Sequence, residues 1–288
     1  MEYAVLGKSG RTVSRLGFGG ATAGLKNYLG EFDPDEREHR DAVLGAIRRA
    51  CELGVNYFDT AAGYGEGRSE RIFGEALEGT DPEAIFLATK AGVGDGSGHA
   101  VRRSLEGSLS NLRRDWIDLL QIHGSAYSQQ GVTAALEKGG MLDEMERMRE
   151  EGLVRHLGFT CEAVNEQLYR LLKTDRFDVI QMQYNLLFQH PYDPTRKSGV
   201  FYDAAQRGMG IVTMRTLTSG MLQKWVAMVN PENTCDYTPA LLQFQLSNPL
   251  VDVALVGMRM VEEVEENVAI CSDLSGRLDL DELHRRYV

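Results

Sequence analysis

Short apolar runs of strand type alternate along the chain with longer segments in which apolar residues recur at helical spacing. This alternation predicts βαβ units and a parallel sheet. The predicted strands cover residues 15–19, 55–59, 85–90, 117–123, 154–159, 179–184, 211–214 and 253–256. The predicted helices that follow them cover residues 36–53, 69–77, 101–112, 133–151, 162–173, 200–207, 239–246 and 262–270.

The number of strand–helix pairs decides the fold class. Eight pairs in one chain favour a closed (β/α)8 TIM barrel over an open, doubly wound sheet. Residues 3–12 precede the first pair and are predicted to form a β-hairpin that caps the bottom of the barrel. The length of 288 residues suits such a barrel, and no linker-like stretch interrupts it. We therefore predict a single domain over residues 1–288.

Composition narrows the class of partner. A formal net charge of −11 argues against nucleic acid or an anionic membrane surface as the main partner. The four cysteines show no disulfide or metal-binding spacing, which fits a reducing compartment and no metal. The N-terminal residues lack a signal-peptide pattern, and no apolar stretch is long enough for a spanning helix. We expect a cytoplasmic protein and, since no amphipathic stripe demands a partner, a monomer.

Three ionisable residues stand at the ends of predicted strands: Asp59, Lys90 and His123. The barrel would bring them together at one mouth, with Tyr64 in the loop after Asp59, because active sites of such barrels lie at the C-terminal ends of the strands. Each has a structural alternative when taken alone. The aspartate can cap a helix, the lysine can flank a strand in solvent, and the histidine can be a satisfied hydrogen-bonding residue. Their joint placement favours a catalytic site.

Several motifs in the same order resemble those of the aldo-keto reductases. They are the segment FDTAAGYG at 58–65, the strand ending in Lys90, the strand DLLQIH at 118–123 and the stretch 256–267. The matches span nearly the whole chain. The resemblance implies an oxidoreductase that moves a hydride between a nicotinamide and a carbonyl or alcohol carbon.

The resemblance also implies a catalytic tetrad of Asp59, Tyr64, Lys90 and His123. Hydride transfer to a carbonyl leaves negative charge on its oxygen, which a nearby acid must neutralise. Tyr64 would be this acid if the Lys90 ammonium holds its pKa well below the usual value. Asp59 would keep Lys90 charged and oriented, and His123 would hydrogen-bond the substrate oxygen. In the oxidative direction Tyr64 becomes the base.

The nicotinamide half of the cofactor matches the family pattern unevenly. Gln181 stands where the family hydrogen-bonds the nicotinamide carboxamide. Thr160 and Cys161 replace a Ser-Asn pair, so only a hydroxyl contact from Thr160 is expected. Met214 replaces a tyrosine that stacks on the ring, and a thioether gives a less directional face. Arg215 is expected to reach the pyrophosphate. Gly20 and Leu217 complete this part of the predicted cofactor site.

The stretch 256–267 resembles the segment that grips the adenosine end. Gly257 belongs to it, Glu266 and Asn267 are expected to contact adenine, and Arg259 is the expected partner of a 2′-phosphate. Glu263 stands where the family often has Arg or Gln, and its charge disfavours that phosphate. We expect NADP(H) to be favoured over NAD(H).

Substrate specificity is expected from the loops after the first, fourth and seventh strands, where Tyr28, Tyr127 and Trp225 are candidates. Trp225 can instead pack its loop onto the barrel. The chain lacks the long C-terminal loop of steroid-handling relatives, so a small aldehyde, ketone or sugar is expected.

Two other functions stay open at this point. A Schiff-base aldolase would use Lys90 as its nucleophile. A non-catalytic NADP(H)-sensing subunit would bind the cofactor without turnover.

Overall fold

Residues 1–287 are described by a computed structural model, and within them eight parallel strands close into a barrel. The hydrogen-bonded order of the strands is β10-β3-β4-β5-β6-β7-β8-β9. The predicted TIM barrel is thereby confirmed. The barrel strands are β3 (Leu16–Gly19), β4 (Tyr57–Asp59), β5 (Phe86–Gly92), β6 (Ile117–His123), β7 (Val154–Cys161), β8 (Val179–Gln183), β9 (Gly210–Met214) and β10 (Val253–Val256).

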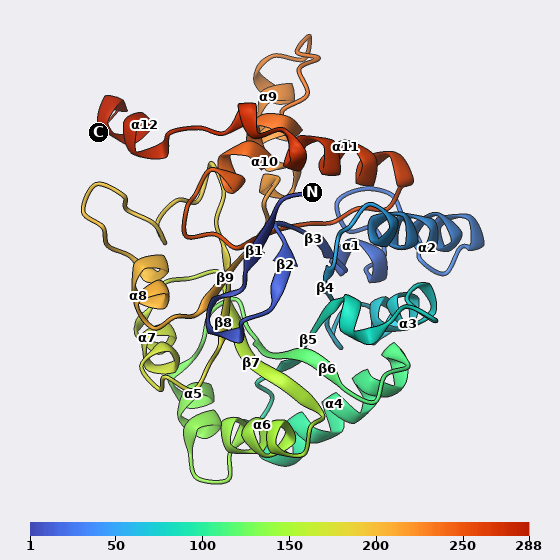
Figure 1. Cartoon of the computed structure of the whole chain (residues 1–288), viewed down its shortest axis with the longest axis vertical. Coiled ribbons are helices and arrows are strands. Elements are labelled where there is room, and N and C mark those ends of the chain that lie inside the picture. The colour runs from blue at the N-terminus through green and yellow to red at the C-terminus, as the bar shows by residue number, and fades with distance from the viewer. Residues whose placement is uncertain (288) are drawn as a thin grey trace.

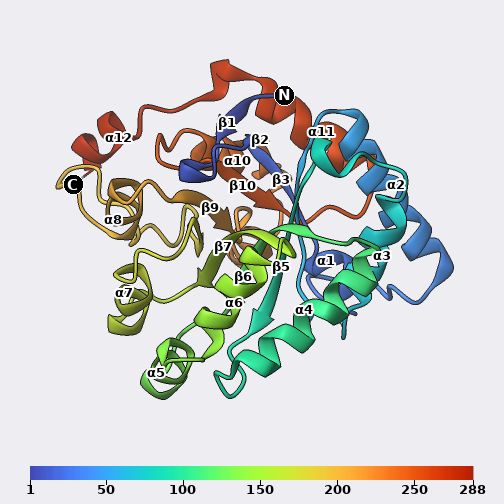
Figure 2. The same cartoon turned by 60° about the horizontal axis from the view of Figure 1, so that its bottom comes forward.

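Helices surround the strands, as Figures 1 and 2 show from two directions. In residues 1–287, no helix is both long and apolar enough to cross a bilayer. The helices are α1 (Ala21–Gly24), α2 (Arg37–Glu52), α3 (Arg68–Ala76), α4 (Gly98–Leu112), α5 (Gln129–Leu136), α6 (Met141–Glu150), α7 (Glu166–Leu172), α8 (Val200–Gln206), α9 (Met221–Val229), α10 (Thr238–Leu246), α11 (Val261–Ser272) and α12 (Leu280–Tyr287).

Alternation along each strand divides the core in two. Tyr57 faces the barrel interior, where it stacks on Phe86 with ring centroids 5.1 Å apart. Its neighbour Phe58 faces outward and packs edge-on against Phe73 of α3. Successive side chains of a strand point to opposite faces, so a near-continuous apolar strand feeds both layers. Polar residues at the C-terminal ends of the strands interrupt this apolar pattern and identify one end of the barrel.

The N-terminal hairpin closes the other end, as predicted. Strand β1 (Tyr3–Val5) pairs antiparallel with β2 (Thr12–Ser14). Leu6 and Val13 of this hairpin are fully buried and join the interior cluster with Tyr57. Figure 1 shows the hairpin lying across the barrel. A ligand must therefore enter from the C-terminal ends of the strands.

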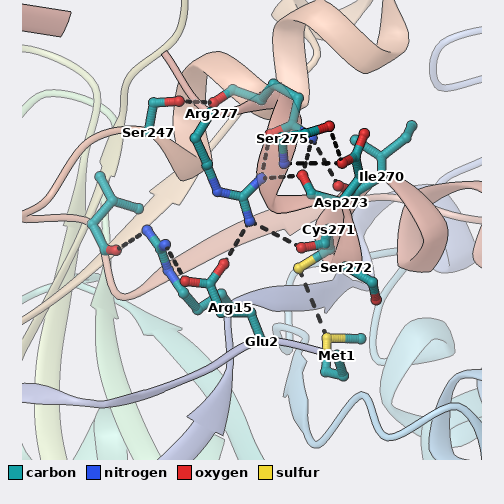
Figure 3. Close-up of polar contacts among 12 residues, drawn as sticks. Met1, Glu2, Arg15, Ser247, Ile270, Cys271, Ser272, Asp273, Ser275 and Arg277 are labelled. Carbon is teal, nitrogen blue, oxygen red and sulfur yellow. Dashed lines mark hydrogen bonds and ion pairs between the residues drawn. The ribbon is translucent and has the colours of Figure 1, made fainter. Parts of the chain in front are cut away.

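A polar network joins the first residues of the chain to the segment after α11 (Figure 3). The carboxylate of Glu2 accepts hydrogen bonds from Arg15 at 2.9 Å and from Arg277 at 2.5 Å. Arg277 also donates to the Cys271 carbonyl at 2.9 Å. This network anchors the chain that leads to α12, a helix that the sequence pattern did not predict.

One predicted helix is wrong in its extent. Residues 133–151 do not form a single helix, because α5 ends at Leu136 and α6 begins at Met141. Gly139 between them has φ of 77°, a left-handed conformation that favours glycine, and a side chain on Gly140 would meet the Ala134 carbonyl at 2.5 Å. Helix α9 was also not predicted. It lies in the long connection after β9 and stands out from the barrel at the top of Figure 1.

Candidate active site

A cavity of about 530 Å³ opens at the C-terminal ends of the barrel strands. It extends from Asp59, Tyr64 and His123 to the turn between β10 and α11. This volume is typical of a small-molecule or cofactor site. The predicted cofactor residues that line it are Gly20, Thr160, Gln181, Met214, Arg215, Leu217, Gly257, Arg259 and Glu263.

Lys90 and Asp59 form a buried ion pair beneath this cavity. Both side chains are almost fully buried, and Lys90 Nζ donates to Asp59 Oδ1 and, at 2.7 Å, to the Thr60 carbonyl. Burial alone would lower the pKa of Lys90, but the Asp59 carboxylate outweighs this effect and holds that pKa above its ordinary value. The lysine is therefore a fixed positive charge.

Tyr64 lies next to this charge. Its hydroxyl oxygen is 3.5 Å from Lys90 Nζ, and the ammonium is 4.9 Å from the centre of the tyrosine ring. The expectation that Lys90 holds the pKa of Tyr64 well below 10 is not met in the protein alone. Burial raises that pKa and outweighs the opposing effect of Lys90. Tyr64 is therefore protonated near neutral pH and can donate a proton.

His123 ends β6 and contacts the Tyr64 ring directly. The two rings meet edge to face with centroids 5.5 Å apart. Burial, together with the Lys90 charge, lowers the pKa of His123 to about 4. The imidazole is therefore neutral near pH 7, with one N–H to donate into the cavity.

Gln181 on β8 is the predicted carboxamide-binding residue, and it is buried at the edge of the cavity. Its Oε1 accepts a hydrogen bond at 3.1 Å from Gln121 Nε2, and its own Nε2 lies 3.7 Å from Met214 Sδ. Sequence reasoning missed Gln121. The available signal was its position two residues before His123, which places both on one face of β6.

Two residues predicted to contact the cofactor are already engaged with protein. The Thr160 hydroxyl accepts from the Gly124 N–H at 3.0 Å and donates to the Gly124 carbonyl at 2.9 Å. The predicted hydroxyl contact from Thr160 therefore loses its donor, because that hydrogen holds the loop after β6. Arg215 is paired with Glu162 at 2.9 Å, although both line the cavity.

Arg259 does not present its charge to an incoming phosphate as predicted. Its guanidinium donates to the carbonyls of Thr22 at 2.9 Å and Tyr28 at 2.5 Å. It also lies 4.0 Å from the centre of the Phe32 ring. These contacts fasten the loop after β3 over the cavity, and they occupy two of the five N–H donors of the guanidinium.

Glu263 occupies the backbone donors at the start of α11. Its Oε2 accepts from the N–H groups of Arg259 at 2.6 Å and Met260 at 3.1 Å. Free N–H groups at a helix N-terminus attract anions. Here the chain's own carboxylate takes that place, so the end of the cavity near α11 is acidic.

Glu266 and Asn267, predicted to contact adenine, are placed elsewhere on α11. Glu266 is exposed, and Asn267 is buried with its Nδ2 donating to the Glu263 carbonyl at 2.7 Å. Among the described residues that line the cavity, neither is present. Both lie one helical turn beyond Glu263, which does line the cavity, and so lie farther from the barrel mouth along α11.

Of the three predicted substrate residues, one lines the cavity and two do not. Tyr28 lines the cavity. Tyr127 is buried behind its wall, where its hydroxyl donates to the Thr160 carbonyl at 2.6 Å. Trp225 lies on α9 and is 50% exposed, away from the cavity. Tyr127 and Trp225 are both absent from the lining formed by residues 1–287.

The geometry of the site agrees with the resemblance of the sequence to the aldo-keto reductases. The model of the Aldo/keto reductase family matches residues 15–234, so the chain belongs to this family of oxidoreductases. It is 28% identical to L-galactose dehydrogenase of Arabidopsis thaliana, over 95% of this chain and 89% of that protein. It is 26% identical to the NADH-specific methylglyoxal reductase of Escherichia coli, over 93% of each.

A solved structure supports the fold independently. The aldo-keto reductase of Klebsiella pneumoniae in complex with NADPH superposes with a TM-score of 0.73. The superposition covers 99% of this chain and 93% of the other at 19% identity. At this identity the likeness concerns the barrel architecture alone.

Proposed function

We propose that this protein transfers a hydride between a nicotinamide dinucleotide and the carbonyl or alcohol carbon of a small aldehyde, ketone or sugar, with Tyr64 as the general acid and base. The observation that carries the proposal is the 3.5 Å contact between Lys90 Nζ and the Tyr64 hydroxyl at the cavity. A buried ammonium in this position stabilises negative charge on the phenol oxygen.

The cavity fits such a cofactor at its inner end. The Gln181 amide nitrogen faces Met214, whose thioether sulfur is a weak acceptor, so this buried donor is available to a carboxamide oxygen. Met214 also offers an apolar surface to a planar ring. The bound dinucleotide supplies the hydride.

The protein's own residues move and hold the proton. Tyr64 donates its proton to the substrate oxygen as negative charge develops there, and the Lys90 ammonium stabilises the phenolate that remains. His123, neutral because its pKa is about 4, donates its N–H to the same oxygen and sets its direction. In the oxidative direction Tyr64 accepts the proton from the alcohol.

The preference between dinucleotides depends on Arg259 and Glu263. Our expectation of NADP(H) over NAD(H) rested on a free Arg259. The contacts of Arg259 with two carbonyls and the carboxylate of Glu263 oppose it. A carboxylate repels a 2′-phosphate and accepts hydrogen bonds from ribose hydroxyls. We therefore favour NAD(H), the specificity named for the Escherichia coli relative.

The burial and charge of Lys90 oppose the aldolase alternative. A Schiff base needs a neutral amine, whereas the pKa of this lysine is held above its ordinary value by the Asp59 carboxylate. The non-catalytic sensing alternative predicts tight cofactor binding without turnover on any substrate.

One experiment tests the proposed function and both alternatives. A panel of aldehydes, ketones and sugars, including methylglyoxal and L-galactose, is assayed with NADH, NADPH and their oxidised forms. We expect a cofactor-dependent change in absorbance at 340 nm with at least one substrate. Binding without turnover would favour a sensing subunit. Borohydride trapping of a substrate on Lys90 would favour an aldolase.

A further inference from the structure

Gln121 lies between the two halves of the active site. It is fully buried on β6, where its backbone pairs with Lys90 of β5 and Gly158 of β7. Its side chain points into the barrel at the level of Asp59 on β4 and Gln181 on β8. These three side chains come from alternate strands, which is how one interior layer of such a barrel is built.

The hydrogen bonds of Gln121 determine which way its amide points. Its Nε2 lies 3.1 Å from Asp59 Oδ2 and 3.1 Å from Gln181 Oε1. An ionised carboxylate only accepts hydrogen bonds, so the atom facing Asp59 must be the nitrogen. An amide nitrogen carries two hydrogens, and both are used here.

This arrangement also determines the orientation of Gln181. Because Oε1 of Gln181 accepts from Gln121, its Nε2 must point the other way, toward Met214 and the cavity. Gln181 also forms a hydrogen bond with the Asp59 carboxylate, so without Gln121 this amide would keep one partner and lose the buried donor that fixes its oxygen. A cofactor carboxamide would then meet a less firmly oriented donor.

The backbone of β7 makes room for this side chain. A Cβ on Gly158 would lie 3.2 Å from Gln121 Cγ and 2.8 Å from the Val179 carbonyl. Gln121 Oε1, by contrast, is buried and without a hydrogen-bond partner among residues 1–287. An unpaired buried acceptor is unfavourable. The side chain is thus held by the two hydrogen bonds of its nitrogen.

We propose that Gln121 is a positioning residue that orients Gln181 toward the cofactor and holds the second oxygen of Asp59. This inference rests on the proposed function and adds a link between cofactor recognition and the Lys90–Asp59 pair. Gln121 touches neither the substrate nor the reacting atoms.

The test uses Gln121→Met, which keeps the length of the side chain and removes both N–H donors. We expect the Kd for NADH and NADPH, measured by quenching of their fluorescence, to rise about fivefold to tenfold, the factor for one neutral hydrogen bond. We also expect the acidic limb of the kcat/KM profile to move to higher pH. Burial raises the pKa of Asp59, and Lys90, Gln181 and, to a smaller extent, Gln121 oppose this effect.

A double-mutant cycle with Gln181→Met separates the two roles. If Gln121 acts on the cofactor through Gln181, it will not change the Kd further in the Gln181→Met background, whereas the shift of the acidic limb will persist. Independent, multiplying effects on Kd would overturn the proposal.

Gln245→Met is the matched control for packing. Gln245 is fully buried on α10 and donates to the Tyr184 carbonyl, away from the cavity. This variant is expected to lower the melting temperature while leaving Kd and the pH profile unchanged. If Gln121→Met behaves in the same way, Gln121 is only a structural residue and the proposal is wrong.

Two further outcomes are distinguishable. If Gln121→Met does not fold, Gln121→Asn, which is shorter and withdraws the amide from both partners, gives the same test. A wild-type protein that binds neither NADH nor NADPH would overturn the proposed function, and the role of Gln121 with it.

Discussion

Replacing Lys90 with methionine removes the positive charge that the proposed chemistry requires. Methionine has a similar length and no charge, so the substitution leaves the space filled. The distance of 3.5 Å between Lys90 Nζ and the Tyr64 oxygen determines the size of the electrostatic energy that is lost. For two unit charges at this separation, an effective dielectric constant of about 20 gives roughly 5 kcal/mol.

This energy converts into an expected loss of rate. At about 1.4 kcal/mol for each factor of ten, a full charge on the Tyr64 oxygen corresponds to roughly 3,000-fold. If only half of that charge has developed in the transition state, the loss is roughly 50-fold. We therefore expect kcat of Lys90→Met to fall within this range, with saturating cofactor and substrate at pH 7.

A loss of folding must be separated from a loss of chemistry. Lys90→Met leaves Asp59 buried without its partner, and breaking a buried ion pair in this way costs about 3–5 kcal/mol of stability. The double variant Asp59→Asn with Lys90→Met removes both charges and should recover much of the melting temperature. It should not recover kcat, because the ammonium is still missing.

The decisive comparison is between the double variant and the wild type. Fluorescence titration with NADH and NADPH first establishes that the double variant binds the cofactor. If that folded, cofactor-binding protein turns over at a rate close to that of the wild type, a charged Lys90 is unnecessary and the acid–base reasoning is wrong.

Four further predictions concern single residues. Tyr64→Phe should lower kcat by about 10²–10⁴ and leave the cofactor Kd within about twofold, since general acid catalysis contributes this much; a wild-type rate would reject Tyr64 as the acid. An NMR titration should show His123 gaining its proton with a midpoint near pH 4, and a midpoint near the ordinary value would contradict the burial argument. Glu263→Gln should shift the ratio of the two Kd values toward NADPH by about tenfold, as expected for one charge–charge repulsion near the surface; an unchanged ratio would show that Glu263 does not select the dinucleotide. Tyr127→Phe should reduce the free energy of unfolding by about 1–3 kcal/mol, because a buried carbonyl loses its donor. A change in KM without a change in stability would instead indicate that Tyr127 is a substrate residue.

The barrel and the convergence of Asp59, Lys90 and His123 followed from the order of strands alone. Parallel strands in a closed barrel all end at one face, so residues at strand ends must meet there. The break between α5 and α6 was also within reach, since two consecutive glycines stand at 139 and 140. Helix α9 was not, because it lies within a long connection and none of its residues is buried against the barrel.

The hydrogen-bond partners of the polar side chains could not be predicted from the sequence in the same way. Arg259 looked free for a phosphate, yet it bonds to carbonyls more than 200 positions earlier in the chain, at Thr22 and Tyr28. The Thr160 hydroxyl likewise donates to a carbonyl of the loop after β6, and the Tyr127 hydroxyl donates to a carbonyl of β7. The periodicity of apolar residues along the chain does not indicate such hydrogen-bond partners.

The amino-acid sequence by itself determined the alternation of strands and helices, the closed barrel and the set of groups delivered to its mouth. Each of these depends on the spacing of hydrophobic residues and on the order of the elements, and both can be obtained directly from the sequence. Only the tertiary structure decided that burial keeps Tyr64 protonated, that Arg259 and Glu263 are already bonded, and that Gln121 joins Asp59 to Gln181. Hydrogen bonds and desolvation act through space over a few ångströms, between residues whose proximity the fold creates.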